Sequence, residues 1–338
     1  MPYPTATDLG VRRLLCAAGQ APSVHNTQPW RFRVAREGAV ELLADPARRL
    51  VRSDPRGRSL HVSCGAALFN LRLAVRVAGY QTFTRPLPAE GGSRLLAVVR
   101  PGPAAAPTPA ELELYAGIGR RRTNREPYED RPLPPAVVAD LRVAASREGA
   151  ALVPLGGYAA TELLDLVAAA EDELAADHAY QAELRTWTTR ESHHDGMPAR
   201  VLGPRPAGDL PPTRDFGAHA AGSRARFEPR PRLMVLTTRG DRPADWLRAG
   251  QALQRVLLVA CAHGVSVSFL NQPLDLRDMR LRGDPGHRRG HAQMILRLGY
   301  GPAVPRAPRR PPAELMAGVR ENPPARGFRL LPPARARG

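Results

Sequence analysis

The chain has 338 residues, 43% of them hydrophobic, and a formal net charge of +17 at pH 7. This length and apolar content exclude a disordered chain and allow two domains with sizeable cores. The sequence contains no Lys, so its 49 Lys and Arg residues are all Arg. The arginines are scattered, aromatic residues make up 5%, and no helix-turn-helix or zinc-finger spacing occurs. We therefore favour small anionic ligands over nucleic acid as partners, with a solvated surface as the alternative for most of these arginines.

Targeting signals and cysteines give little further information. We find no apolar run long enough to span a bilayer, and the N-terminal "MPYPTATDLG" lacks the basic and apolar regions of a signal peptide. We therefore expect a cytoplasmic protein without a membrane partner. The three cysteines, Cys16, Cys64 and Cys261, lie far apart in apolar helical stretches and are interpreted as reduced core residues.

The first part of the chain alternates helical and strand patterns. Helices are predicted at 8–20 and 61–80, and strands at "WRFRVAR", "AVELLAD" and 94–100. The Pro/Ala-rich stretch "PGPAAAPTPA" follows and is predicted to be a linker.

The second part repeats this alternation. Helices are predicted at "ELELYAGIG", "AVVADLRVAASREGA", 160–188 and 246–264, and strands at "ALVPL", "RLMVLTT", "VSVSFL" and "QMILRLGY". Residues 192–230 are rich in Gly, Pro, His and Arg without a clear period, which is typical of a lid or mobile segment. Within them, "SHHD" at 192–195 matches no zinc spacing and is interpreted as a solvated loop, so no metal site is predicted.

The two long apolar helices resemble each other. "SCGAALFNLRLAVRVAGY" and "AGQALQRVLLVACAHGVS" share the pattern small-Gly-x-Ala-Leu, followed by an apolar stretch that ends in Gly. This pattern indicates a duplication in which each half is an α+β unit.

The loop "APSVHNTQPW", residues 21–30, is unusually polar for a connection between a helix and a strand. Ser23, Asn26 and Gln28 supply donors and acceptors, Pro22 and Pro29 stiffen the loop, and Trp30 begins the next strand. Such a loop suits a flat heterocycle with polar edges, and a well-capped turn is the alternative.

A basic segment in the second half points to a phosphate. Arg121, Arg122 and Arg125 surround Thr123 and Asn124, and Arg309 and Arg310 stand between prolines near the C-terminus. Arginine is the preferred bidentate partner of phosphate. Taken with the loop at 21–30, these residues predict a mononucleotide cofactor, whereas each arginine cluster taken alone reads as surface charge.

These motifs resemble the nitroreductase family, and its Acg-like branch of actinobacterial proteins in particular. "APSVHNTQPWRFRV" resembles the family's flavin loop, "RRRTNREPY" its phosphate clamp, and "RLGYGPAVPRAPRRP" its C-terminal basic pair. The resemblance covers most of the chain except residues 190–230. It implies an α+β nitroreductase-like fold, made of two fused repeats that form an intramolecular pseudo-dimer.

The resemblance also implies the cofactor and its ligands. FMN would carry the redox chemistry at its N5 atom, with no catalytic protein side chain required. It places Pro22, Ser23 and Asn26 beside the isoalloxazine, and Arg121, Thr123 and Arg125 at the phosphate, joined by Arg310 and less surely by Arg309. Asn271 and Gln272 would present backbone N–H groups to the flavin, although the family often has Gly or Glu-Gly there.

The motifs are divided between the halves. Residues 1–100 contain the flavin loop without a clamp, and residues 111–330 contain the clamp, the C-terminal arm and a lid-like insert at 190–230, with a linker at 101–110. One composite FMN site is therefore expected, in a monomer.

Two functions follow from the resemblance. The first is an FMN-dependent oxidoreductase with NAD(P)H as donor and a nitro, quinone or other small organic compound as acceptor. The alternative is a catalytically weak protein that sequesters the flavin under a lid. No Gly-x-Gly-x-x-Gly follows a strand, so no separate Rossmann domain for NAD(P)H is expected.

Overall fold

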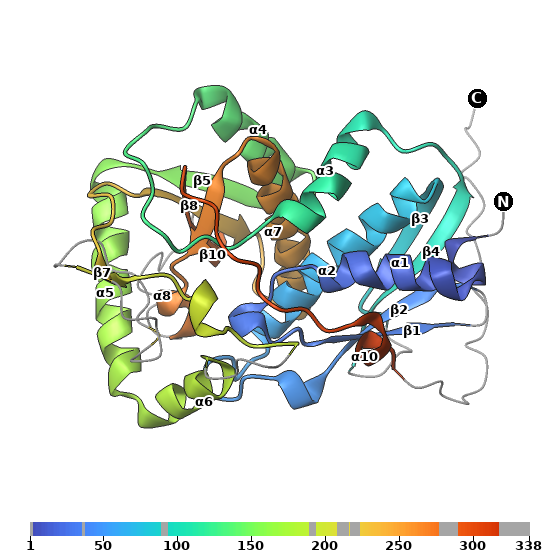
Figure 1. The fold of residues 1–338 in the computed structure, drawn as a ribbon, viewed down its shortest axis with the longest axis horizontal. Coiled ribbons are helices and arrows are strands. Elements are labelled where there is room, and N and C mark those ends of the chain that lie inside the picture. Colours follow the sequence, from blue (N-terminus) through green and yellow to red (C-terminus); the bar gives the residue numbers. More distant parts are fainter. Residues whose placement is uncertain are drawn as a thin grey trace.

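Two four-stranded antiparallel sheets lie at opposite ends of the computed structural model, with two long helices between them (Figure 1). The structure describes residues 3–35, 38–88, 94–188, 194–207, 216, 224–276 and 290–317. The first sheet has the order β1-β2-β4-β3, with β1 Trp30–Val34, β2 Val40–Ala44, β3 Tyr80–Pro86 and β4 Leu95–Ala104. The second has the order β5-β8-β10-β9, with β5 Ala151–Leu155, β8 Arg232–Thr238, β9 Ser266–Phe269 and β10 His291–Gly299.

The helices occupy equivalent places in the two halves. α1 (Asp8–Gly19) precedes the first strand of one sheet and α4 (Pro135–Ser146) precedes that of the other. α2 (Arg58–Val77) connects the second and third strands of the first sheet, and α7 (Pro243–Ala262) does the same in the second. Both halves therefore follow one topology, helix-strand-strand-helix-strand-strand, with the same strand order.

The long helices α2 and α7 pack against each other and join the two cores. Leu247 and Leu258 of α7 belong to the apolar cluster of the first half, and Val62 of α2 belongs to that of the second. Inside this contact the Gln254 side-chain amide donates a 2.8 Å hydrogen bond to the Asn70 side-chain oxygen. The halves are therefore held together by shared apolar packing.

α2 also has the length and composition that would let a helix cross a membrane, which corrects our statement that no apolar run is long enough. In the fold, 78% of that window is buried. This degree of burial is typical of a core helix.

Three other expectations need correction. The strand before the linker continues as β4 to Ala104, and α3 (Pro109–Arg120) begins within the predicted linker, so only residues 105–108 connect them. The strand β3 was not predicted. The helix predicted at 160–188 is two helices, α5 (Gly157–Ala176) and α6 (His178–Thr188), separated at Asp177. The Asp177 carboxylate accepts hydrogen bonds from the backbone N–H groups of Ala179 and Tyr180, so it caps α6 and interrupts the helix.

The long segment between β5 and β8 forms a cover with a small core of its own. α5 and α6 contribute Leu174, Tyr180 and Leu184, and the following segment contributes Met197, Leu202 and Phe216. A two-stranded parallel sheet, β6 (Arg205–Pro206) and β7 (Arg224–Ala225), lies in the same region. Much of the predicted lid at 190–230 falls outside the described residues.

After β10 the chain crosses from the second half to the first. This C-terminal arm, residues 300–317, ends with the short helix α10 (Pro312–Leu315) beside α1 and β1 (Figure 1). There the backbone N–H of Ala317 donates a 2.7 Å hydrogen bond to the carbonyl of Phe32.

Candidate flavin site

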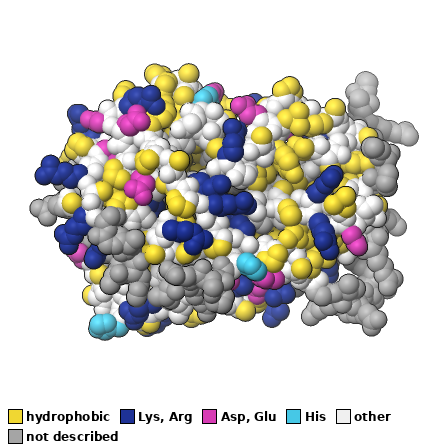
Figure 2. Space-filling model, in the orientation of Figure 1, with side chains coloured by type: hydrophobic (Ala, Val, Ile, Leu, Met, Phe, Trp, Pro, Cys, Tyr) yellow, Lys and Arg dark blue, Asp and Glu magenta, His cyan; other side chains and the backbone are white. Residues whose placement is uncertain are grey.

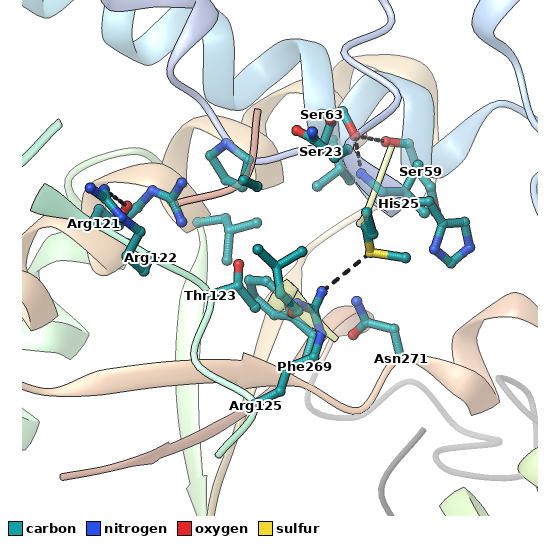
Figure 3. A pocket seen from close by; sticks show the side chains of 18 of the residues that line it. Ser23, His25, Ser59, Ser63, Arg121, Arg122, Thr123, Arg125, Phe269 and Asn271 are labelled. Atoms are coloured by element: carbon teal, nitrogen blue, oxygen red, sulfur yellow. Dashed lines mark hydrogen bonds between the residues drawn. The ribbon is translucent and has the colours of Figure 1, made fainter. Parts of the chain in front are cut away.

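A pocket lies where the two halves, the cover and the C-terminal arm meet. Eight of the ten residues predicted to bind the cofactor line it: Pro22, Ser23, Asn26, Arg121, Thr123, Arg125, Asn271 and Arg309. The pocket separates the Arg121 and Arg122 side chains at one end from Ser23, Ser59 and Ser63 at the other (Figure 3). The structure therefore brings most of the predicted residues together from segments far apart in the sequence.

The clamp segment 121–125 is fixed along the edge of β9. Thr123 forms a parallel bridge to Val267, and the backbone N–H of Asn124 donates to the Val267 carbonyl at 3.0 Å. The Asn124 side-chain amide donates to the Ser266 hydroxyl at 3.0 Å and to the Pro302 carbonyl at 2.8 Å. The segment is thereby tied both to the second sheet and to the start of the C-terminal arm.

A buried ion pair between Arg297 and Glu228 packs beside the clamp segment and is hydrogen-bonded to the residues that follow it. Arg297 of β10 donates two 2.6 Å hydrogen bonds to the two carboxylate oxygens of Glu228 and one of 3.1 Å to the Glu126 carbonyl. The same carboxylate accepts from the backbone N–H of Tyr128, and the Tyr128 hydroxyl donates to the Asn124 carbonyl at 2.6 Å. This network is satisfied on both sides, as a buried charge pair requires.

Four arginines converge at one end of the pocket without a carboxylate partner among the described residues: Arg121, Arg122, Arg306 and Arg309. Burial, followed by the nearby charges of Arg122 and Arg306, lowers the pKa of Arg121 to about 10. Burial likewise lowers the pKa of Arg309 to about 9, with Arg121, Arg306 and Arg122 adding to the effect. Like charges held together in a desolvated place favour a bound anion.

Three donors in this cluster have no partner. Arg121 is 6% exposed, and its Nε and Nη1 atoms make no hydrogen bond with the described residues. The Nε atom of Arg309 is also buried and makes no hydrogen bond with the described residues. Because buried donors in native proteins are almost always satisfied, three orphaned N–H groups in one pocket mark a ligand site.

The two neighbouring arginines of the arm have different surroundings. Arg309 lines the pocket and donates to the Asn26 side-chain oxygen at 2.8 Å. Arg310 lies outside the pocket lining and is 5% exposed. It donates to the backbone carbonyls of Gln28 and Trp30 at 3.2 and 3.3 Å and to that of Glu314, so it fixes the arm to the first half.

Arg125 faces the cover. It donates to the Val201 carbonyl at 2.8 Å, contacts the Met197 sulfur at 3.5 Å and lies 5.3 Å from the centre of the Phe216 ring. In Figure 3 it lies apart from Arg121 and Arg122. Arg125 lines the same pocket as Arg121, and its role at a phosphate stays a prediction.

The loop at 21–30 adopts a conformation that its sequence did not reveal. His25, Asn26 and Gln28 have φ angles of 45°, 54° and 49°, in the left-handed region that few non-glycine residues occupy. The Ser23 hydroxyl accepts from the backbone N–H of Gln28, and the Ser63 hydroxyl accepts from that of Val24. Strain of this kind is retained mainly at functional sites.

This loop also binds the cover. Asn26 donates through its side chain to the Gly196 carbonyl at 2.8 Å, and its own carbonyl accepts from Gly196 at 3.2 Å. Gln28 donates to the His194 carbonyl at 2.8 Å, and the Asp195 carboxylate pairs with Arg48 at 2.6 Å. Asp195 is 7% exposed, so the expectation of a solvated loop at "SHHD" is wrong for this residue, while residues 192 and 193 lie outside the described residues.

Two neighbouring predicted residues, Asn271 and Gln272, lie at the start of the short helix α8 (Gln272–Asp275), with Asn271 as its N-cap. Asn271 lines the pocket, and its side-chain oxygen accepts from the backbone N–H of Ile295 at 2.9 Å. Gln272 is fully buried outside the pocket lining. Sequence reasoning missed Ser59, Ser63, Met197, Phe216 and Arg306 as lining residues; the basic run "PRAPRR" was the available signal for the last of these.

The equivalent position in the other half is closed. The connection between α1 and β1 has ten residues, 20–29, whereas that between α4 and β5 has four, 147–150. In the shorter turn Glu148 accepts from Arg72 at 2.7 Å and from Arg255 at 2.8 Å. These side chains satisfy one another, in contrast to the orphaned arginines of the open pocket.

Comparison with known proteins agrees with this architecture. The model of the nitroreductase family matches residues 118–300. Rv3131 and Acg of Mycobacterium tuberculosis, both named "Putative NAD(P)H nitroreductase", are 33% and 29% identical to this chain. The alignments cover 89% and 92% of this chain and 89% and 96% of those proteins. The crystal structure of a nitroreductase with bound FMN from Bacteroides fragilis is 14% identical over 65% of this chain and 98% of its own, with a TM-score of 0.35. The chain therefore belongs to the nitroreductase family.

Proposed function

We propose that this protein is an FMN-dependent oxidoreductase that takes electrons from NAD(P)H and reduces a small nitro, quinone or other organic acceptor. The observation that carries the proposal is the set of three orphaned donors on Arg121 and Arg309 in a pocket lined by the family's flavin loop. A phosphate monoester has three terminal oxygens that accept such donors.

The rest of the pocket suits the remainder of the cofactor. FMN, when bound, supplies the redox chemistry, and the protein binds and orients it. Arg121 and Arg309 would hold the phosphate, with the Thr123 hydroxyl beside them. Ser23 and Asn271 also line the pocket and would border the ring system, and Met197 and Phe216 of the cover would exclude water from it.

We further propose that the chain is a monomer with one FMN, in which two fused repeats take the place of two subunits. The shared topology of the two sheets and the contact between α2 and α7 support this proposal. The closed turn at Glu148 supports a single site.

Anaerobic mixing with NADPH or NADH tests the function directly. The proposed oxidoreductase loses its yellow flavin absorbance within seconds and recovers it when a quinone or nitro compound is added. A flavin that stays oxidised over an hour with both donors would contradict it.

A second candidate function, flavin sequestration, is favoured by the contacts that hold the cover against the first half. Asp195 is held by Arg48, and Gly196 exchanges two hydrogen bonds with Asn26. Both contacts must break before a nicotinamide can reach the pocket from this side. Slow bleaching of a fully loaded protein would support this function.

A further inference from the structure

The basic end of the pocket contains more charge than one phosphate requires. Arg121 and Arg309 together offer three buried N–H groups without partners, which matches the three terminal oxygens of one phosphate monoester. Arg122 and Arg306 also line the pocket, and neither has a carboxylate partner among the described residues. Two arginines are therefore left over after one phosphate is bound.

These two arginines lie further out than the first pair. Arg306 is exposed and Arg122 is half-buried, whereas Arg121 is buried. Arg306 is hydrogen-bonded to the Gln20 side chain, and Arg122 donates to the Gly119 and Arg121 carbonyls at 2.8 and 2.9 Å. Basic side chains gather near the middle of this face of the molecule (Figure 2).

The charges of the outer pair act on the inner pair. Arg306 lies close enough to lower the pKa of Arg121, Arg122 and Arg309. For Arg122 itself, burial is the largest cause of the lowered pKa, followed by Arg306.

We propose that Arg122 and Arg306 form a second anion site at the entrance of the pocket, which binds a further phosphate group beyond the one held by Arg121 and Arg309. This inference rests on the proposed function. Two sources supply such a group next to a flavin site: the 2′-phosphate of NADPH, which NADH lacks, and the second phosphate of FAD, which FMN lacks.

Identification of the flavin separates the two sources. The purified chain is denatured and its released flavin is resolved by chromatography. If the released flavin is FAD, the second phosphate belongs to the cofactor. Substitution of both outer arginines, R122A/R306A, then weakens the binding of FAD at least tenfold more than the binding of FMN. An equal loss for both flavins would overturn the proposal in that case.

If the released flavin is FMN, the second phosphate belongs to the electron donor. Calorimetry on the FMN-loaded protein then compares adenosine 2′,5′-bisphosphate with adenosine 5′-monophosphate. We expect at least tenfold tighter binding of the bisphosphate, lost in R122A/R306A. Arg120→Ala is the matched control, because Arg120 is an exposed arginine next to the clamp and outside the pocket lining, so it should keep the preference.

The kinetics of flavin reduction provide a second readout if the released flavin is FMN. The rate constant for flavin reduction per molar donor should favour NADPH over NADH at least tenfold in the wild type and the control, and less than threefold in R122A/R306A. Equal use of both donors by the wild type would overturn the second site and leave the proposed function intact. A chain that binds neither flavin would overturn both.

Discussion

Gly65 of α2 and Gly250 of α7 face each other so closely that a Cβ atom on either would lie 2.9 or 2.8 Å from the Cα atom of the other. The same added atoms would also collide with the carbonyl oxygens of Leu247 and Val62, each three residues before a glycine. The contact is thus equivalent from both sides.

Gly65→Ala should therefore weaken the packing of α2 against α7. The methyl group meets backbone atoms that cannot move aside, so we expect a loss of about 3 kcal/mol in the free energy of unfolding. Gly119→Ala is the matched control, because its Cβ meets nothing within 4 Å in α3, and it should stabilise by about 0.5–1 kcal/mol. Urea unfolding of the two variants checks both signs. Equal stability of G65A and the wild type would contradict the close packing of α2 and α7.

Arg309 and Arg310 should respond in opposite ways to substitution by Met. Arg310→Met removes charged hydrogen bonds to the Gln28, Trp30 and Glu314 carbonyls, and should cost about 1.5–3 kcal/mol of stability. Arg309→Met removes one of four repelling charges as well as its bond to Asn26, so we expect a change within about 1 kcal/mol. Denaturation of the flavin-free proteins measures this, and FMN affinity should fall only for Arg309→Met among variants that remain folded. If FMN affinity fell for Arg310→Met and not for Arg309→Met, Arg310 would be the arginine that binds the phosphate.

The ion pair between Arg48 and Asp195 should control access to the pocket. Asp195→Asn removes a partly buried 2.6 Å contact worth about 1.5–3 kcal/mol, so flavin reduction by NADPH should accelerate by about tenfold or more if opening of the cover limits the rate. Asp130→Asn is the control, since its pairs with Arg230 and Arg232 are 3.8 Å long and exposed. Stopped-flow rates for D195N no faster than for D130N would mean that the cover does not limit reduction.

Glu111 should make the start of α3 sensitive to acid. Its hydrogen bond with Arg76, aided by the backbone and hydroxyl of Thr108, lowers its pKa from 4.5 to about 2, against the opposing effect of burial. Because the folded-state pKa lies below the unfolded one, the stabilisation is complete above pH 4.5 and disappears as the pH falls through about 2. The shift corresponds to about 3 kcal/mol, which solvent screening reduces to about 1 kcal/mol.

Glu111→Gln should flatten the stability profile between pH 4.5 and pH 2, whereas Glu113→Gln, at an exposed position of the same helix, should not. Thermal unfolding across this range provides the measurement. A variant at Glu111 that keeps the wild-type pH dependence would rule out this ion pair as its source.

The sequence predicted the elements whose signal is periodic and the residues whose signal is a local motif. The helices around Gly65 and Gly250, and the strands β1, β2, β5 and β8, were found because apolar residues recur at the spacing of the element. β3 was missed because the helix predicted at 61–80 was carried through Gly79, the turn residue that separates α2 from β3.

The site was harder to predict because the roles of its residues depend on contacts between distant segments. Nothing in "RR" distinguishes Arg309, which faces the pocket, from Arg310, which meets the Gln28 and Trp30 carbonyls some 280 residues away. The strained loop is a similar case. His25 and Asn26 are residue types that tolerate positive φ, whereas Gln28 is not, and the Arg48–Asp195 and Asn26–Gly196 contacts hold the loop from outside.

Titration of the flavin-free chain with FMN tests the single composite site most directly. The account predicts one FMN per chain, and a chain that sediments as a monomer before and after loading. In R121A/R309A, loss of two charged partners of the phosphate, each worth about 1.5–3 kcal/mol, should weaken FMN at least about a hundredfold. Riboflavin, which lacks the phosphate, should bind the wild type and the double variant equally. Full-affinity FMN binding by R121A/R309A, or two FMN per chain, would contradict the account.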